Sequence, residues 1–328
     1  MAFRTTAILR QGLKLRSPIE LAQRTACLEL VIIRRSLETD ALKGLCGEDI
    51  VGVEKTVEAM TTAMYENRLD VYATSVEKSM LVKPYRTWES SDYAYGDHCE
   101  ALGVLLWLLG RQQAIPTYYS HTDWHRLLGD SSIILHESPN IEKYVNSFMS
   151  SQIHQTFDKQ QLQRAVGTSE AWLWRSRAQA LLGLRDKLCR IYSNLTGDTQ
   201  DSSLEAKLRA LNIPHSQCKM IANLHETIPL AAQRAHEKGF IGEIVGGDFG
   251  VGMDIKENNA VPAEQRRSAT VPYSSLDPDH LDSLRRIAES RFLAFAWASG
   301  KIDKWCPEKA GELAPINPVN ALWTPDEN

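Results

Sequence analysis

Helix-start signals in front of apolar segments constrain this chain more than any other feature. Ser17, Ser138 and Asp277 are each followed directly by proline, and a capping residue before proline is typical of the first position of a helix. Glu20 completes a capping box with the first of these residues. Apolar residues then recur at helical spacing, at Ile19, Ala22, Ala26, Leu30 and Ile33. The sequence therefore predicts a mostly α-helical fold.

The same spacing predicts helices farther along the chain, over 98–109, 141–157, 170–195, 204–211, 216–236 and 279–299. Ser169 is the predicted cap of the long helix that follows it. Pro229 is predicted to kink or restart the helix that contains it, because proline lacks the backbone donor that a helix interior needs. The aromatic and polar segment 84–96 has no clear period and is predicted to be a loop.

One segment has a different character. Residues 239–252 hold six glycines among alternating apolar residues, which predicts a loop with one or two short strands. The predicted architecture is a single multi-helix domain over residues 16–306, with a small irregular or β element near 239–254. Residues 1–15 form a basic lead-in, and residues 307–328, which contain several prolines, form an extended tail.

Composition excludes some classes of protein. The formal net charge of −4 argues against a general nucleic-acid binder, which needs a basic face. The longest apolar run, 101–109, is too short to span a membrane. None of the six cysteines has a close neighbour of its own kind, which is typical of a reducing compartment and favours the cytoplasm. Residues 1–15 carry arginine and lysine but no acid, so a mitochondrial location is the alternative.

The known catalytic and metal-binding motifs are incomplete in this sequence. The run from Gly246 to Gly252 lacks the Gly-Lys-Ser/Thr of a phosphate loop and the companion motifs of a kinase. It is predicted to be a tight turn near the core, with Asp248 kept as a candidate site residue. His121 and His125 have the four-residue spacing of a metal pair but show no third ligand nearby. We therefore predict no metal and no cofactor.

Charged residues inside apolar, tryptophan-bearing helices are the most informative signal. These charged residues, one neighbouring tryptophan and Asp248 are the candidate ligand-binding residues. Besides Asp248, the set consists of Glu100, Trp107, Arg175, Arg177, Glu289 and Arg291. These helices have little polar face, and a buried charge is costly unless it is paired. We expect the acids and arginines to form an inter-helix ion-pair cluster. That cluster either fixes helix register or lines a pocket for an anionic ligand, and the remaining alternative is that the charges face solvent.

Several segments share a pattern of apolar, aromatic and charged residues: Arg16–Arg24, Cys99–Gly110, Ala171–Ala178, Gly247–Gly250 and Ile287–Arg291, followed by Trp297, Gly300 and Trp305. Together they resemble the mainly bacterial family called domain of unknown function 4272. The sequence departs from the family pattern at Ser290, Phe295-Ala296 and Cys306. The resemblance implies a helical fold and highlights the same charges, but the family has no assigned activity.

Two functions remain open. The first is a non-catalytic helical interaction module with a protein partner, which is favoured because the sequence contains no complete catalytic motif. The second is an enzyme or small-ligand binder that uses the Glu/Arg/Trp cluster on an anionic ligand. Trp305 and Trp323 lie outside the strong helices and are candidate exposed anchors for a partner. A membrane partner is not expected, and a nucleic acid is the least favoured partner.

Overall fold

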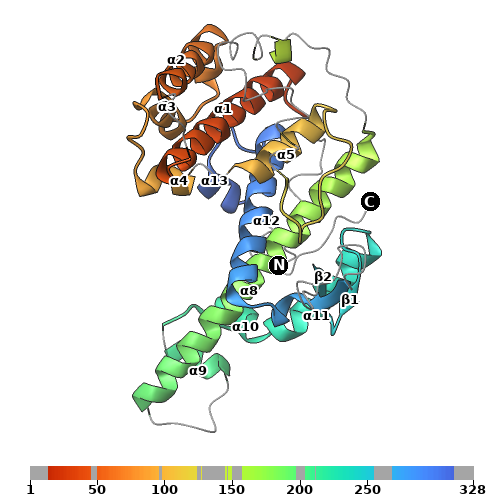
Figure 1. Cartoon of the computed structure of the whole chain (residues 1–328). Coiled ribbons are helices and arrows are strands. Elements are labelled where there is room, and N and C mark those ends of the chain that lie inside the picture. Colours follow the sequence, from red (N-terminus) through yellow and green to blue (C-terminus); the bar gives the residue numbers. More distant parts are fainter. Residues whose placement is uncertain are drawn as a thin grey trace. The chain divides into compact units, whose positions relative to one another are not determined.

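The computed structural model describes residues 14–45, 50–95, 98–123, 127, 145, 147–149, 157–196, 204–210, 212–254 and 268–313. These residues are mostly helical, and they include one small three-stranded antiparallel sheet (Figure 1). The predicted fold class, mostly α with a small β element, is confirmed. Within this part of the chain, no helix is both long and apolar enough to cross a membrane.

The chain divides into two compact units. We call the first the bundle unit; it comprises Lys14–Asp158 and Leu293–Cys306. We call the second the hairpin unit; it comprises Met1–Leu13, Lys159–Phe292 and Pro307–Asn328. The boundary falls within helix α12 (Pro278–Ala298). The expectation of one domain over residues 16–306 stays a prediction.

The bundle unit is built around helix α1. Its other described elements are α2 (Ile50–Glu66), η1 (Leu69–Val71), α3 (Ser75–Val82), α4 (Ser90–Tyr95) and α5 (Cys99–Leu108). Helix α1 spans Pro18–Leu42 and begins as predicted: Ser17 is the N-cap, Pro18 follows it, and Glu20 completes the capping box. The helix contacts α2, α3, α5 and η1. Because these neighbours surround it, every residue from 21 to 34 except Gln23 is buried.

The start of the bundle unit is fixed to the end of α12 by Arg16. Its backbone N–H donates to the carbonyl of Ala298 at 2.8 Å. Its guanidinium donates to the carbonyls of Trp297 at 2.9 Å and of Ile302 and Asp303 at 3.0 Å each. Arg16 thus satisfies carbonyls that the end of a helix leaves open. Gly300, with φ +68°, turns the chain just beyond that end.

The hairpin unit combines helices with the sheet. Its helices are α8 (Lys159–Thr196), α9 (Leu204–Ala210), α10 (His215–Ala222), α11 (Leu224–Glu237), the first part of α12, and α13 (Pro307–Gly311), with η4 over Tyr273–Ser275. Leu208, Cys218 and Ile221 form a small core with Leu188 of α8. This core holds α9 and α10 against the long helix, as Figure 1 shows.

The sheet lies where the sequence predicts short strands. Strand β1 (Ile244–Val245) pairs with β2 (Asp248–Asp254), and β2 pairs with β3 (Ser268–Pro272). Gly246 and Gly247 connect β1 to β2 with φ values of +59° and +79°. Two successive positive φ angles are typical of the tight hairpin turn that suits twisted strands. The glycine-rich run is therefore a turn, as predicted.

Several predicted boundaries are wrong. Ser169 does not cap a helix: it is buried inside α8, which begins ten residues earlier, at Lys159. Leu162 and Val166 are both buried one turn apart, so tertiary packing extends the helix through a residue pattern that resembles a cap. The helix does not restart at Pro229, which lies inside the continuous helix α11; the break falls at Asn223 instead.

Three other segments are more regular than predicted. Residues 90–95 of the expected loop form α4, where the carboxylate of Asp92 accepts the N–H of Glu89 at 2.8 Å. The start of the expected extended tail is the short helix α13. No helix or strand is predicted between residues 255 and 276, yet residues 268–275 form β3 and η4. The tail beyond residue 313 and most of the helix expected over 141–157 lie outside the described residues.

Candidate functional site

Arg175 and Asp248 form a buried ion pair in the hairpin unit. Arg175 comes from α8 and Asp248 from the first position of β2. The Nε atom of Arg175 donates to Oδ1 of Asp248 at 2.5 Å, and Nη2 donates to Oδ2 at 2.6 Å. The guanidinium also lies 4.4 Å from the ring centre of Tyr273. Two parallel bonds and an aromatic face fix both the position and the orientation of this arginine.

The hairpin presents Asp248 to the arginine. The carboxylate of Asp248 also accepts the N–H groups of Phe249 at 2.7 Å and of Ser274 at 3.0 Å. Burial alone raises the pKa of Asp248, but the hydrogen bonds and charge of Arg175 outweigh it and hold that pKa below its ordinary value. Burial raises the pKa of the neighbouring Tyr273 to about 12. The pair is therefore charged at neutral pH, and Tyr273 is not.

Three further candidates lie in the same unit with other surroundings. Arg177 is largely buried and donates from Nη1 to the carbonyl of Gly311 at 2.8 Å. Burial lowers its pKa, and the charge of Glu289 opposes that change. The carboxylate of Glu289 accepts a bond from Arg285 at 3.0 Å, and its side chain is 43% exposed. Arg291 has no exposed surface.

Glu100 and Trp107 belong to α5 in the bundle unit. The carboxylate of Glu100 accepts the backbone N–H of Thr122 at 2.8 Å and its hydroxyl at 2.7 Å. His121 approaches the same carboxylate at 3.3 Å. The Trp107 ring stacks on Phe157 at 4.7 Å, and it meets the edge of Phe295. Trp107 is thus part of an aromatic core.

The structure brings together only part of the predicted cluster. Arg175 meets a carboxylate in the interior, as expected, but that carboxylate belongs to Asp248 and not to Glu100 or Glu289. Asp248 was named as a candidate on its own, from the glycine-rich run. Residue order gave no sign that the hairpin would carry it to α8. That buried ion pairs are present is confirmed; an inter-helix cluster that includes Glu100 and Glu289, and its role as a ligand site, stay predictions.

Sequence reasoning missed a second buried pair, between Arg24 of α1 and Glu77 of α3. Nη1 and Nη2 of Arg24 donate to the two oxygens of Glu77 at 2.7 and 2.6 Å. Nη1 also donates to the carbonyl of Tyr72 at 2.7 Å. The guanidinium lies 4.1 Å from the ring centre of Trp305. Trp305 is only 5% exposed, so its prediction as an exposed anchor is wrong; Trp323 lies outside the described residues.

The carboxylate of Glu77 is held ionised by its surroundings. Burial raises its pKa, but Arg24, His98 and the N–H of Thr74 together lower it to about 2. The Thr74 bond, at 2.7 Å, is one half of the capping box at the start of α3. His98 approaches Glu77 at 3.7 Å. One carboxylate thus serves α1, α3 and the residue that precedes α5.

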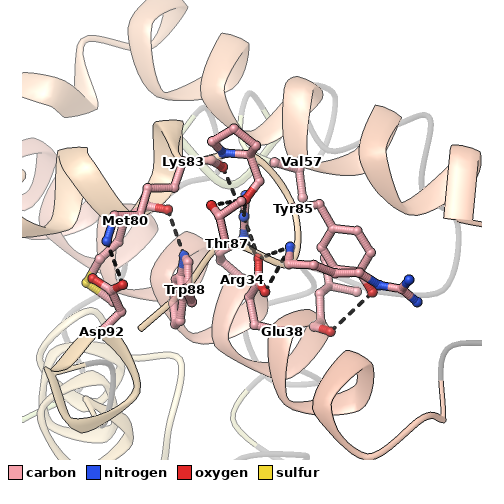
Figure 2. A network of polar contacts seen from close by, with 12 residues as sticks. Arg34, Glu38, Val57, Met80, Lys83, Tyr85, Thr87, Trp88 and Asp92 are labelled. Atoms are coloured by element: carbon pink, nitrogen blue, oxygen red, sulfur yellow. Dashed lines mark hydrogen bonds and ion pairs between the residues drawn. The ribbon is translucent and has the colours of Figure 1, made fainter. Parts of the chain in front are cut away.

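A third buried pair, Arg34 with Glu38, lies one turn apart on α1 (Figure 2). Nη2 of Arg34 donates to Glu38 at 2.5 Å and to the carbonyls of Lys83 and Pro84 at 3.0 Å each. Glu38 in turn accepts the backbone N–H of Arg86 at 3.1 Å on both oxygens. The pair therefore fixes the segment that connects α3 to α4.

A neighbouring contact extends the network of Figure 2. The indole N–H of Trp88 donates to the carbonyl of Met80 at 3.0 Å, and Nζ of Lys83 meets Asp92 at 2.6 Å. Trp88 is buried, whereas Arg86 and Thr87 beside it are exposed. The segment is anchored by aromatic and ionic contacts and presents few reactive groups.

A signal for these two pairs was present in the sequence. Arg24, Arg34 and Glu38 lie within the apolar pattern of the first helix, just as Arg175 lies within the pattern of α8. The prediction for this helix uses only its apolar positions, so it includes no buried charge and no ion pair there. Glu77 gave no such signal, because α3 is short and its apolar pattern is weak.

The arrangement is ionic and structural more than chemically reactive. Each of the three buried pairs joins segments distant in sequence or fixes a connection, and each arginine faces a carboxylate. Among the described residues, no group of three or more histidine, cysteine or acidic side chains is placed to hold a metal. His125 lies outside them. Cys27, Cys99, Cys189, Cys218 and Cys306 are free thiols.

Comparison with known proteins found no match: no family model, no curated protein and no solved structure resembles the chain closely enough to count. The resemblance to the domain of unknown function 4272 family therefore stays a prediction.

Proposed function

We propose that the chain is a non-catalytic helical interaction module that binds a protein partner. The observation that carries the proposal is that three buried arginines are shielded from solvent and already paired. Arg24, Arg34 and Arg175 have no exposed side-chain surface, and each is bonded to a carboxylate. An arginine that recognises an anionic ligand needs an open side for it. Arginines already bonded to acids instead hold helices in register.

A group of exposed apolar side chains supports the binding role. Leu42 is the last residue of α1, Leu45 follows three positions later, and Ile50 and Val51 begin α2; we call these four residues the turn patch. Their exposed fractions are 71%, 68%, 37% and 62%. Single exposed apolar residues are common, but four within ten positions of one connection are typical of an interaction surface.

The competing function is a small-ligand site around Arg175. One observation favours it: within the described part of the chain, Nη1 of Arg175 is buried and has no hydrogen-bond partner. A ligand bound there raises the thermal stability of the wild-type protein.

The interaction-module proposal also includes the family resemblance and a cytoplasmic location, which the cysteine pattern supports.

The test compares two variants in cell extract. The patch variant carries Leu42→Ser, Leu45→Ser and Val51→Ser. The control variant carries Val71→Ser, Val76→Ser and Leu230→Ser, which are also exposed, at 71%, 42% and 52%. We expect quantitative mass spectrometry to identify proteins retained by the wild type and the control but lost from the patch variant. The same retained set for all three proteins would contradict the proposal.

A thermal-shift panel of carboxylates, phosphates, nucleotides and metal ions tests the competing function. We expect no compound to stabilise the wild type and fail to stabilise Arg175→Lys. A compound with that behaviour would replace the interaction module by a ligand-binding site, since it would require the geometry of the arginine fork.

A further inference from the structure

The solvent face of α2 includes Val51 of the turn patch. The buried residues of this helix are Thr56, Val57, Met60, Ala63 and Met64. Val51, Glu58 and Tyr65 are spaced by seven residues, which places them on one face, opposite the buried one. All three are exposed, and so is Glu54, one turn from Val51 and from Glu58. The helix therefore presents a stripe that is apolar at both ends, with Glu54 and Glu58 between them and exposed Lys55 beside them.

The acidity of this region is concentrated. Residues 46–66 contain Glu48, Asp49, Glu54, Glu58 and Glu66 against the single base Lys55, which leaves a net charge of −4. That equals the formal net charge of the entire chain, also −4. Glu48 and Asp49 lie outside the described residues, so the structural argument depends on Glu54 and Glu58.

These two glutamates differ from the carboxylates of the interior. Glu38 and Glu77 are buried and bonded to arginine. Glu54 and Glu58 are exposed, and within the described residues their side chains make no ion pair. Their charge is available to a partner. The field they create repels anionic partners, such as nucleic acids and acidic lipid surfaces, and attracts cationic ones.

We propose that the turn patch and the exposed face of α2 bind a basic amphipathic helix of a protein partner. The inference rests on the proposed interaction module and assigns its partner class. Apolar side chains of the partner helix cover Leu42, Leu45 and Val51, and burial of that surface supplies the affinity. Lysine or arginine on the flanks of the partner helix meets Glu54 and Glu58. Exposed ion pairs add little affinity each, so these glutamates chiefly set orientation and selectivity.

The test uses fluorescence anisotropy with a labelled model peptide of about 18 residues, long enough to form a helix on binding. Leucine occupies one helical face and lysine the flanks. One control peptide has glutamate in place of each lysine. A second has the same composition in an order that spreads leucine around the helix. We expect binding of the first peptide alone, with an affinity that falls as salt rises from about 50 mM to about 500 mM.

Protein variants identify the surface. We expect the patch variant and the double variant Glu54→Lys/Glu58→Lys each to bind the peptide about tenfold more weakly than the wild type. Glu226→Lys/Glu237→Lys, which reverses two exposed charges on α11, serves as the matched control and should bind as the wild type does. Circular dichroism and thermal melting check that every variant is folded.

Three results would overturn the proposal. The glutamate peptide could bind as tightly as the lysine peptide. The Glu54/Glu58 reversal could leave binding unchanged. Sedimentation could show the patch joining two copies of the chain with no peptide bound. If proteins are still lost from the patch variant in cell extract, each of these results rejects the partner class alone; if none is lost, the interaction module falls with it.

Discussion

Arg24 and Glu77 form a two-bond ion pair in which neither side chain has any exposed surface. The two residues are 53 positions apart in the sequence, so their ion pair connects α1, the first helix of the bundle unit, to α3. Removing charged groups from water is costly, and mutual attraction with good geometry offsets that cost. Either residue alone would be a buried charge without a partner, so the pair stabilises the fold only while both residues are present.

Breaking this pair from either side should destabilise the bundle unit strongly. We expect Arg24→Met or Glu77→Gln to lower the free energy of unfolding by about 3–5 kcal/mol, because each leaves a buried charge without its partner. The double variant Arg24→Met/Glu77→Gln should cost less than the sum of the two. Urea unfolding followed by circular dichroism measures all three. Additive losses would show that the two residues act independently.

Acid should weaken the same pair. The pKa of Glu77 is about 2 in the folded protein against an ordinary value of 4.5, so the folded state binds fewer protons than the unfolded state between these pH values. Stability from this group is complete above about pH 5 and is lost as the pH falls toward 2, on the order of 3 kcal/mol in total. Unfolding of the wild type and Glu77→Gln between pH 6 and pH 3 measures it. We expect the difference in free energy of unfolding between the wild type and Glu77→Gln to become smaller as the pH falls. A difference that stays constant would contradict the low pKa of Glu77.

Loss of Asp248 should be felt mainly in the hairpin unit. Asp248→Asn removes the charge that Arg175 faces, and we expect a loss of about 3–5 kcal/mol. Hydrogen exchange of the amides of α8 and β2 should accelerate, because these elements carry the two partners. Asp277→Asn is the control: its carboxylate is 56% exposed, and exposed pairs contribute about 0–1 kcal/mol. Equal effects of the two substitutions would contradict a structural role for the buried pair.

Two glycines should respond in opposite directions to alanine. A Cβ atom on Gly250 would lie 2.8 Å from the carbonyl oxygen of Glu243 and 2.8 Å from a Thr270 methyl group, so the hairpin must shift. A Cβ atom on Gly183 in α8 would meet nothing within 4 Å. We expect Gly250→Ala to lower the melting temperature. Gly183→Ala should raise stability by about 1 kcal/mol, the difference in helix propensity. Calorimetry measures both, and a stabilised Gly250→Ala would show that the hairpin is looser than the contacts indicate.

The sequence by itself determined where α1 begins and where α12 ends, because capping and chain reversal are local. Ser17 accepts the N–H of Glu20, Glu20 accepts the N–H of Ser17, and Pro18 has no N–H to satisfy. Gly300 reverses the chain with its own backbone. The Gly246-Gly247 turn was equally readable, since few residues other than glycine adopt two positive φ angles in succession. The cost of burying charge also indicated that arginines within apolar helices must find acids.

Only the tertiary structure decided which acids they find. Asp248 reaches Arg175 across 73 positions of sequence, and Glu77 reaches Arg24 across 53. Nothing local distinguishes these carboxylates from Glu289, which bonds to Arg285 on its own helix. Helix extent also depended on packing: Ser169 and Pro229 carry local signals against a helix interior, yet burial of their neighbours in α8 and α11 outweighs a local cost of a few kcal/mol.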